Sequence, residues 1–273
     1  MIAQSFSYHR PASWDEAAIL YAEEAKTGGT PMYYGGGTEI LTRARLGEVA
    51  PSAVIDLKGI PETRELSRRR GNLVLGAALT LAELSDSGWS LLAQASGRVA
   101  DHTTRRQITL GGNLAGTVFY RESALPFLLV PTTAIVAGRN GTRRVDLAKV
   151  FEEGILTLND GEFLMALEVP LDRLPERSIA IKRTRLDWVD YPLVTVALAE
   201  KDGEWIVALS GYLDRPFRAH AVERSLNDGM GTLADRIRRG VEGLPEPLSD
   251  VHGSAAYRRF VLGWALEDAL NVI

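Results

Sequence analysis

The chain has 273 residues, of which 45% are hydrophobic and 24% charged, so it can form one large domain or two smaller ones around a buried core. Its formal net charge of −4 argues against a nucleic-acid-binding surface, and the absence of cysteine excludes disulfides, thiol catalysis and any iron–sulfur cluster held by thiolates of this chain. No apolar run has membrane-spanning length and residues 1–6 lack the features of a signal peptide, so we expect a cytoplasmic protein without membrane insertion.

The first part of the chain predicts a helix, a strand, a glycine-rich turn, a second helix and a second strand. Ser13 and Glu16 have the spacing of a capping box, which opens a helix that ends at Gly28 and Gly29. The elements after it are a strand over residues 31–34, a helix over 38–46 and a strand over 53–57.

A second block is predicted to begin with a strand over residues 72–77 and to end at Pro170. Thr80 and Glu83 form another capping box, and helices are expected from there to residue 100. A second glycine cluster follows, and the rest of the block consists of an apolar segment over 125–130 and strands over 133–137, 143–147 and 162–169.

The last hundred residues predict strands first and helices afterwards. The strands are expected over 178–185, 194–200 and 205–213, and the helices over 218–227, 233–243 and 255–271. Since the second and third strands are joined by a short turn, this order predicts an α+β domain with a three-stranded antiparallel sheet and helices on one of its faces.

Two glycine clusters, about 75 residues apart, are the most informative motifs. They read Tyr34-Gly35-Gly36-Gly37-Thr38-Glu39-Ile40 and Thr109-Leu110-Gly111-Gly112-Asn113-Leu114. Glycine lets backbone N–H groups approach an anion closely, and a helix that starts at Thr38 adds its positive end. One such cluster is more often a plain turn, whereas two suggest a diphosphate held between two turns. Neither cluster fits the G-x-G-x-x-G or P-loop pattern, so a Rossmann or P-loop protein is disfavoured.

Other polar residues leave alternatives open. The four histidines lack metal-ligand spacing and no G-x-S-x-G motif is present, so we assign neither a metal site nor a catalytic residue. Glu39 can accept from a ribose hydroxyl or serve as a first-turn carboxylate that the helix dipole favours. Lys182 lies in the middle of a predicted strand, where alternation alone also allows a position on the solvent face.

These motifs, in this order along the whole chain, resemble the FAD-binding (medium) subunit of the molybdenum hydroxylases, the family of xanthine dehydrogenase and carbon monoxide dehydrogenase. Residues 35–40 are similar to the first pyrophosphate loop of that family, and residues 109–114 to its second. The other segments that carry the resemblance are 54–57, 76–84, 215–219 and 253–259.

The resemblance implies a two-part FAD-binding domain of the PCMH/vanillyl-alcohol-oxidase-like type over residues 1–172, with subdomains at about 1–57 and 58–172. An α+β C-terminal domain would follow over residues 173–273. It also implies the ligand contacts. One side of the FAD diphosphate would be held by Tyr34, Gly35, Gly36, Gly37, Thr38, Glu39 and Ile40, and the other by Thr109, Gly111, Gly112, Asn113 and Gly116.

By the same resemblance, Val99 and Ala100 would pack on the adenosine portion and Leu164 would lie near the flavin ring. Lys182 coincides with a lysine that reaches the isoalloxazine, where an ammonium would stabilise the negative charge of the reduced ring and raise its potential. The chain departs from the family at the aspartate that binds the adenine ribose, and Glu122 is the residue that would replace it. Residues 186–191, beyond Lys182, are the candidate for a loop over the flavin.

The implied function is that of an oxidoreductase subunit: an FAD-binding electron-transfer subunit of a multi-subunit molybdopterin-dependent dehydrogenase or hydroxylase. Its partners would be an iron–sulfur subunit and a molybdopterin subunit, and NAD⁺ or another acceptor would receive the electrons. A stand-alone FAD-dependent oxidase or reductase is the first alternative, and it would need its own proton-transfer group, for which Asp190 and Tyr191 are candidates. A scaffold subunit without a cofactor is the second.

Overall fold

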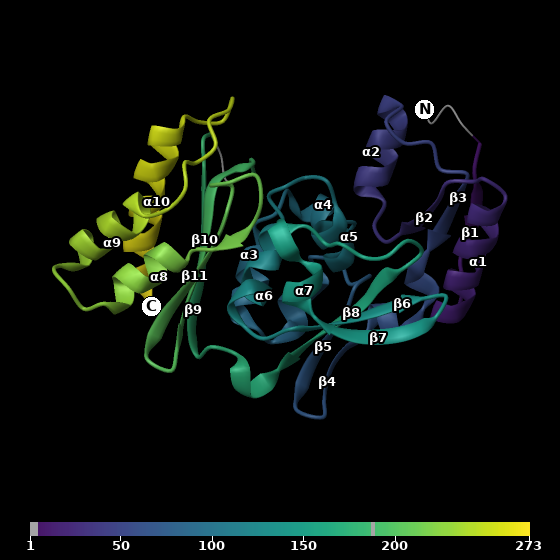
Figure 1. Ribbon diagram of the computed structural model, residues 1–273, viewed down its shortest axis with the longest axis horizontal. Helices are drawn as coiled ribbons and strands as arrows, with labels where there is room; N and C mark the ends of the chain where they lie inside the picture. The colour runs from purple at the N-terminus through teal and green to yellow at the C-terminus, as the bar shows by residue number, and fades with distance from the viewer. Residues whose placement is uncertain (1–4, 187–188) are drawn as a thin grey trace.

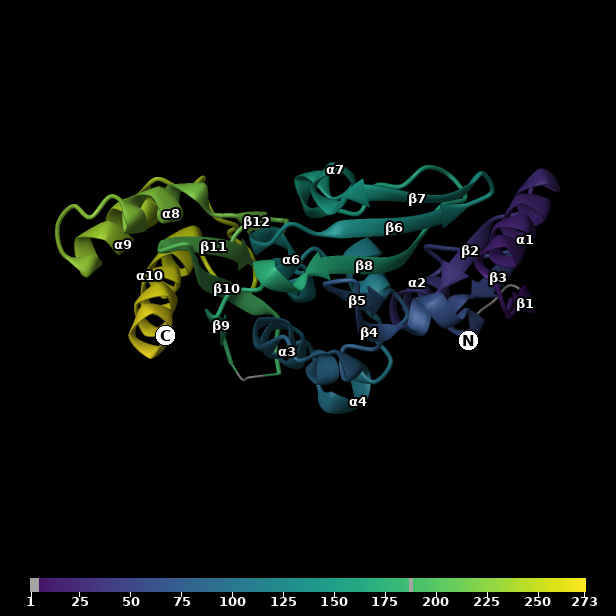
Figure 2. The same cartoon turned by 90° about the horizontal axis from the view of Figure 1, so that it is seen from below.

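The computed structural model describes residues 5–186 and 189–273 (Figure 1). Within these residues, three sheets succeed one another along the long axis of the molecule, with the N-terminal sheet at one end and the C-terminal sheet at the other. Figure 2, turned by 90°, shows the middle sheet between the other two. None of the described helices is long and apolar enough to cross a membrane.

The first sheet is parallel and the other two are antiparallel. The first has the order β1-β3-β2 and consists of β1 (Ser7–His9), β2 (Pro31–Tyr34) and β3 (Ala53–Asp56). The second has the order β4-β5-β8-β6-β7 and consists of β4 (Leu66–Arg69), β5 (Asn72–Gly76), β6 (Thr133–Gly138), β7 (Gly141–Asp146) and β8 (Phe163–Pro170). The third has the order β12-β11-β10-β9 and consists of β9 (Arg177–Thr184), β10 (Pro192–Lys201), β11 (Glu204–Ser210) and β12 (Phe217–Arg218).

Helices flank each sheet. The α-helices are α1 (Trp14–Lys26), α2 (Thr38–Leu46), α3 (Ser90–Gly97), α4 (His102–Arg105), α5 (Leu110–Ala115), α6 (Leu125–Leu129), α7 (Leu147–Val150), α8 (His220–Asn227), α9 (Leu233–Glu242) and α10 (Ala255–Val272). Short 3₁₀ turns lie at Leu57–Gly59, Pro61–Arg64, Glu83–Ser87, Glu122–Ala124, Leu171–Arg173 and, around a left-handed Glu153, Glu152–Gly154.

The predicted α+β class is confirmed, with differences in detail. Thr80 and Glu83 form their capping box, but it opens a 3₁₀ turn that ends where Gly88 adopts a left-handed φ of 70°. The region expected to be helical up to residue 100 is therefore divided, and α3 begins only at Ser90. The sheet predicted with three strands has a fourth, since the two-residue β12 pairs with β11.

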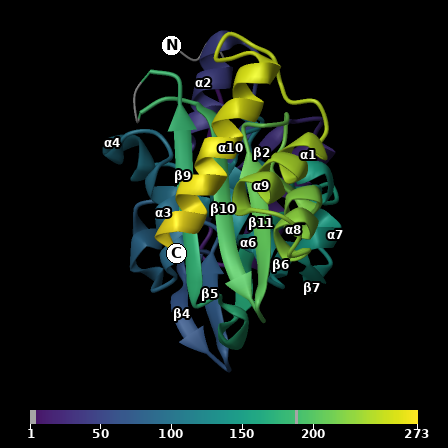
Figure 3. The same cartoon turned by 90° about the vertical axis from the view of Figure 1, so that its left-hand side faces the viewer.

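The C-terminal sheet is covered on both faces, and its alternating residues differ in size accordingly. Large side chains such as Val196, Leu198 and Leu209 pack under α8, α9 and α10, and Figure 3 shows α10 lying across β9 and β10. Small residues, among them Ala180 and Ala197, belong to the core cluster of the middle region. This close approach turns the opposite face of β9 towards the interior of the chain.

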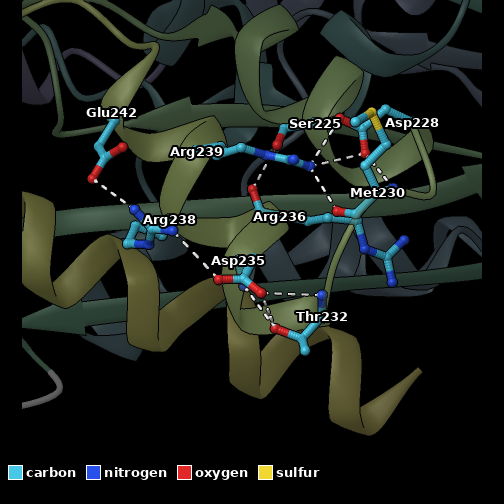
Figure 4. Close-up of polar contacts among 9 residues, drawn as sticks. All are labelled: Ser225, Asp228, Met230, Thr232, Asp235, Arg236, Arg238, Arg239 and Glu242. Carbon is cyan, nitrogen blue, oxygen red and sulfur yellow. Dashed lines mark hydrogen bonds and ion pairs between the residues drawn. The ribbon is translucent and has the colours of Figure 1, made fainter.

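The helical layer is fixed by polar caps as well as by its apolar face. At the start of α9 the Thr232 hydroxyl accepts from the Asp235 N–H at 3.2 Å, and the Asp235 carboxylate accepts from the Thr232 N–H at 3.2 Å (Figure 4). Arg239 reaches back from α9 to the carboxylate of Asp228, which follows α8. These contacts lie at the end of the molecule remote from the first sheet (Figure 1).

Candidate functional site

The two glycine clusters of the sequence pack directly on one another. A Cβ atom at Gly36 would lie 1.7 Å from the carbonyl oxygen of Gln107, and one at Gly35 would lie 2.6 Å from the hydroxyl oxygen of Thr109. Real Cβ atoms do not approach other atoms this closely, so side chains at these positions would separate the two turns. The glycines are therefore needed for the contact between the turns.

The first turn presents the N-terminal end of α2. Gly37 is the N-cap with a left-handed φ of 71°, and no side chain caps the helix. The N–H groups of the first helical turn thus have no intrahelical acceptor, and they point with the positive end of the helix dipole towards whatever lies in front of the turn.

Lys58 holds this first turn in shape. Its ammonium donates to the Gly35 carbonyl at 2.7 Å, pairs with the Asp56 carboxylate at 2.7 Å and lies 4.3 Å from the centre of the Tyr34 ring. Tyr34 itself packs on Gly37, where a Cβ would lie 2.1 Å from the ring. Tyr34 is consequently a support behind the turn.

The second turn uses most of its backbone donors within the chain. Thr109 caps α5 by accepting from the Gly112 N–H at 3.2 Å, and the Gly111 N–H donates to the Ala77 carbonyl at 2.8 Å. The Asn113 side-chain oxygen accepts from the Ser123 hydroxyl at 2.5 Å. The free backbone donors of the site therefore belong mainly to the first turn.

Glu39 connects the two turns. Its carboxylate accepts from the Thr117 N–H at 2.8 Å and from the Thr117 hydroxyl at 2.7 Å, and it lies 3.8 Å from the Arg43 guanidinium. Gly116 leaves room for it, because a Cβ there would lie 2.5 Å from Glu39 Oε2. Of the two roles open from the sequence, this geometry favours a carboxylate that serves the backbone.

A cleft of about 710 Å³ opens where the turns meet, and it is also bounded by the 3₁₀ turn at Glu122 and by β9. Most residues expected to bind a ligand line it, namely Gly35, Gly36, Gly37, Thr38, Glu39, Ile40, Val99, Ala100, Thr109, Gly112, Asn113, Gly116, Glu122 and Lys182. Its volume lies within the range of about 300–1,000 Å³ that is usual for small-molecule sites.

Three expected site residues do not line the cleft. Tyr34 stands behind the first turn, and Gly111 packs on Ala77, where a Cβ would lie 2.9 Å from the alanine side chain. Leu164 lies in β8 with 5% exposure, within the core cluster of the middle region. The alternation of β8 turns Leu164 into the protein interior, so its place near a ligand remains a prediction.

Lys182 and Glu122 form a buried ion pair in the cleft wall. Their charged atoms are 2.9 Å apart, the two side chains are 4% and 5% exposed, and the ammonium also donates to the Arg98 carbonyl at 2.9 Å. Burial raises the pKa of Glu122 although Lys182 opposes the shift. Lys182 is therefore not on the solvent face, because its face of β9 is the one that packs on the interior.

Aromatic rings close one side of the cleft. Tyr120 is buried and stacks on Tyr191, with 4.8 Å between the ring centres and 21° between the planes. Burial raises the pKa of Tyr120 to about 12, so its hydroxyl stays protonated at neutral pH. Tyr191 belongs to the segment expected to cover a ligand, and Val189 and Asp190 of that segment also line the cleft. Asp187 and Trp188 lie outside the described residues.

Two cleft residues that are not glycine have left-handed backbones. Ala100 has a φ of 48° and Arg121 a φ of 37°. Such conformations are rare for residues with a Cβ and often occur at functional sites. Arg121 did not stand out in the sequence, since neither its residue type nor its spacing indicated this role.

The described residues contain no group of three His, Cys, Asp or Glu side chains placed to hold a metal ion. The cleft chemistry available from the chain consists of backbone N–H groups, one buried ion pair, an arginine, aromatic rings and apolar walls. Such a set suits an elongated ligand with an anionic part and a flat aromatic part.

Comparisons with known proteins point in the same direction. Residues 4–172 match a family profile described as "FAD binding domain in molybdopterin dehydrogenase". The carbon monoxide dehydrogenase medium chain of Hydrogenophaga pseudoflava is 26% identical over 286 aligned residues, which cover 99% of this chain and 98% of that protein.

Solved structures show the same similarity. Carbon monoxide dehydrogenase from Hydrogenophaga pseudoflava aligns with a TM-score of 0.84 at 25% identity, over 99% of this chain and 98% of that one. Quinoline 2-oxidoreductase from Pseudomonas putida 86 aligns with a TM-score of 0.82 at 26% identity, over 98% of both chains.

Proposed function

The chain belongs to the family of FAD-binding domains of molybdopterin dehydrogenases, and on this premise we propose that it is the FAD-binding electron-transfer subunit of a multi-subunit molybdopterin-dependent dehydrogenase or hydroxylase. The observation that carries the proposal is the cleft between two interlocked glycine turns, one of which presents the uncapped N-terminus of α2. When bound there, FAD supplies one- and two-electron chemistry that no side chain of the protein can perform.

The residues of the cleft fit this cofactor. The N–H groups at the start of α2, with Gly35, Gly36 and Gly37, would receive the diphosphate, since backbone donors and a helix N-terminus suit an anion. Asn113 and Thr109 would bound it from the second turn. Tyr34 and Gly111 would support the two turns from behind. This division of labour follows from which donors are free and which are already bonded within the chain.

The remaining walls would hold the two ring systems. Val99 and Ala100 offer apolar surface for the adenosine portion, and Lys182, fixed by Glu122, offers a positive charge for the flavin end. An ammonium near the flavin favours the reduced form, which carries negative charge. Leu164 would act through the packing of β8, and a contact between Glu122 and the adenine ribose would have to coexist with its ion pair to Lys182.

The partners would be an iron–sulfur subunit and a molybdopterin subunit. One sequence relative is named a medium chain, which denotes one chain among several, and this chain covers nearly all of that relative. Since the chain has no cysteine, clusters ligated by thiolates would have to lie on another chain. We propose NAD⁺ or another diffusible acceptor as the destination of the electrons, and the cytoplasm as the location.

We also propose two domains, residues 1–172 and 173–273, with the first divided near residue 57. The boundary falls at the 3₁₀ turn Leu171–Arg173, between the last strand of the middle sheet and the first strand of the C-terminal sheet. The alanine face of that last sheet packs on the first domain, so the two would be stable as a unit.

The stand-alone oxidase is less well supported by the cleft. Such an enzyme needs a free proton-transfer group over the cofactor, whereas Glu122 and Lys182 pair with each other and Asp190 accepts from the Tyr191 N–H. The cofactor-free scaffold is disfavoured because the glycine turns still interlock around a cleft of suitable size.

Affinity purification of the tagged chain from its source cells tests the proposal. We expect an iron–sulfur protein and a molybdopterin protein to co-purify, with FAD reduction by the substrate of the complex only when all three are present. Turnover of an oxidisable substrate by the isolated flavin-loaded chain would favour the stand-alone enzyme. A purified complex without flavin would favour the scaffold.

A further inference from the structure

The charges that line the cleft are not all paired. Among the described residues, its cations are Arg43, Arg121 and Lys182. Lys182 pairs with Glu122 at 2.9 Å, and Arg43 lies within 4 Å of two carboxylates, those of Glu39 and Glu48. Arg121 has no carboxylate within this distance in the part of the chain that the structure describes.

The partners of Arg121 are neutral. Its Nε and Nη2 atoms donate to the Gly116 carbonyl at 3.1 and 2.5 Å, and Nη1 donates to the Gly154 carbonyl at 3.0 Å. These bonds use three of the five N–H groups of a guanidinium. Carbonyl dipoles stabilise a cation locally, but they leave its net charge in the cleft wall.

This arrangement is costly for the chain without a ligand. Arg121 is only 4% exposed, and a buried charge without a counter-charge loses hydration that carbonyls replace only in part. Its backbone is also left-handed, with a φ of 37° and a ψ of 50°. Burial lowers the pKa of Arg121, with Glu39 as the one carboxylate that opposes the shift.

The position of Arg121 relates it to the anion-binding turns. The guanidinium lies against Gly116, which follows α5 and packs on the carboxylate that joins the two turns. The turns themselves offer neutral N–H donors, whereas a dinucleotide diphosphate carries two negative charges. Because the effective dielectric constant of a buried cleft is low, a guanidinium stabilises such an anion over several ångströms without touching it.

We propose that Arg121 is the counter-charge of this cleft: it recognises the negative charge of a diphosphate ligand, and its own burial is compensated only when that ligand is bound. This inference rests on the proposed function for the identity of the ligand as FAD. For the class of ligand, an adenosine diphosphate group, it stands on the charges of the cleft alone.

The test compares the binding of FAD and of ADP to the full chain and to R121Q, R121K and R236Q, at low and at high salt. Arg236 is the matched control, since its guanidinium also donates to a backbone carbonyl, that of Leu226 at 2.8 Å, but it lies among the C-terminal helices away from the cleft (Figure 4). Circular dichroism establishes that each variant is folded.

We expect R121Q to weaken both ligands by about tenfold or more at low salt, R121K to retain part of the affinity, and R236Q to change it by less than about twofold. Salt should weaken the binding of ADP to the wild type more than to R121Q, because the variant lacks the charge that salt screens. Unchanged affinity in R121Q, or a loss with the same salt dependence as the wild type, would overturn the inference. If the wild type binds ADP but not FAD, the proposed function fails and the role of Arg121 is judged from ADP alone.

Discussion

The carboxylate of Glu39 accepts two hydrogen bonds from Thr117, one from its N–H at 2.8 Å and one from its hydroxyl at 2.7 Å, across 78 residues of sequence. Glu39 lies in the first turn of α2, after the first glycine turn, and Thr117 follows the helix of the second. The relative position of the two turns, and with it the shape of the cleft, therefore depends on this contact.

Replacement of Glu39 by Ala should loosen the cleft. Hydrogen bonds to a charged group contribute about 1.5–3 kcal/mol, and the partial exposure of Glu39 places the expected loss of unfolding free energy near the lower end of that range. FAD affinity should fall by about tenfold. Urea unfolding of the apo chain and FAD titration measure the two effects. Glu48→Gln, an exposed partner of Arg43, is the control and should change neither.

The glycines at the contact between the turns should not tolerate a side chain. Gly36→Ala would place a Cβ 1.7 Å from the Gln107 carbonyl, and Gly116→Ala would place one 2.5 Å from Glu39. We expect both variants to lose FAD binding, with the larger loss of stability in Gly36→Ala because backbone must move. Gly97→Ala, at the end of α3 with no atom within 4 Å, should be neutral. Equal FAD affinity in Gly36→Ala and Gly97→Ala would refute the interlocked arrangement.

Removal of one member of the buried ion pair should be costly. Lys182→Met leaves Glu122 buried without a partner, which typically costs about 3–5 kcal/mol. The double variant with Glu122→Gln should recover part of that loss, because no uncompensated charge remains. A double-mutant cycle by urea unfolding of the apo chain measures the coupling. Additive effects of the two substitutions would mean that the pair does not act as a unit.

The stability of the apo chain should also depend on pH through Glu122. Its pKa is raised by burial above the ordinary value of 4.5, so the folded chain retains a proton that the unfolded chain releases. This contribution is complete below pH 4.5 and is lost as pH rises through the raised pKa. We expect Glu122→Gln to remove this fall in stability, and Lys182→Met to make it steeper. The same pH slope in Glu122→Gln as in the wild type would contradict this assignment.

Glu162 should have the opposite pH dependence. Its pKa is lowered to about 2, chiefly by two hydrogen bonds of 2.8 Å from Arg143, so its contribution is present above the ordinary value of 4.5 and is lost as pH falls towards 2. Arg143 is partly exposed, and we therefore expect Glu162→Gln to cost only about 1 kcal/mol at neutral pH. Acid titration of unfolding free energy checks this, with the exposed Glu62→Gln as a control that should leave the profile unchanged.

Much of the fold could be predicted from the sequence because its longer elements have regular patterns. The first helix begins at the predicted cap Ser13, and the helix after the first glycine turn spans 38–46 as expected. The two-residue β12 is too short to show alternation, and β4 at Leu66–Arg69 carries arginines that read as a solvated turn. The interruption at Gly88 depends on a left-handed φ that composition does not reveal.

The site was predictable only where glycine marks it. The two turns were found from their glycines, but the contact of Glu39 with Thr117 depends on the fold bringing 78 residues together. The side of the sheet that Lys182 faces was open because alternation does not tell which face is covered, and here both are. Arg121 gave no signal, since its partners are backbone carbonyls and its backbone conformation is not encoded in any motif.

The most direct measurement for the central claim is the visible absorption spectrum of the purified chain, followed by heat release and identification of the flavin. The account predicts a yellow protein that releases about one FAD per chain. A colourless protein that also fails to take up added FAD would contradict it, because the interlocked glycine turns would then have only a structural role.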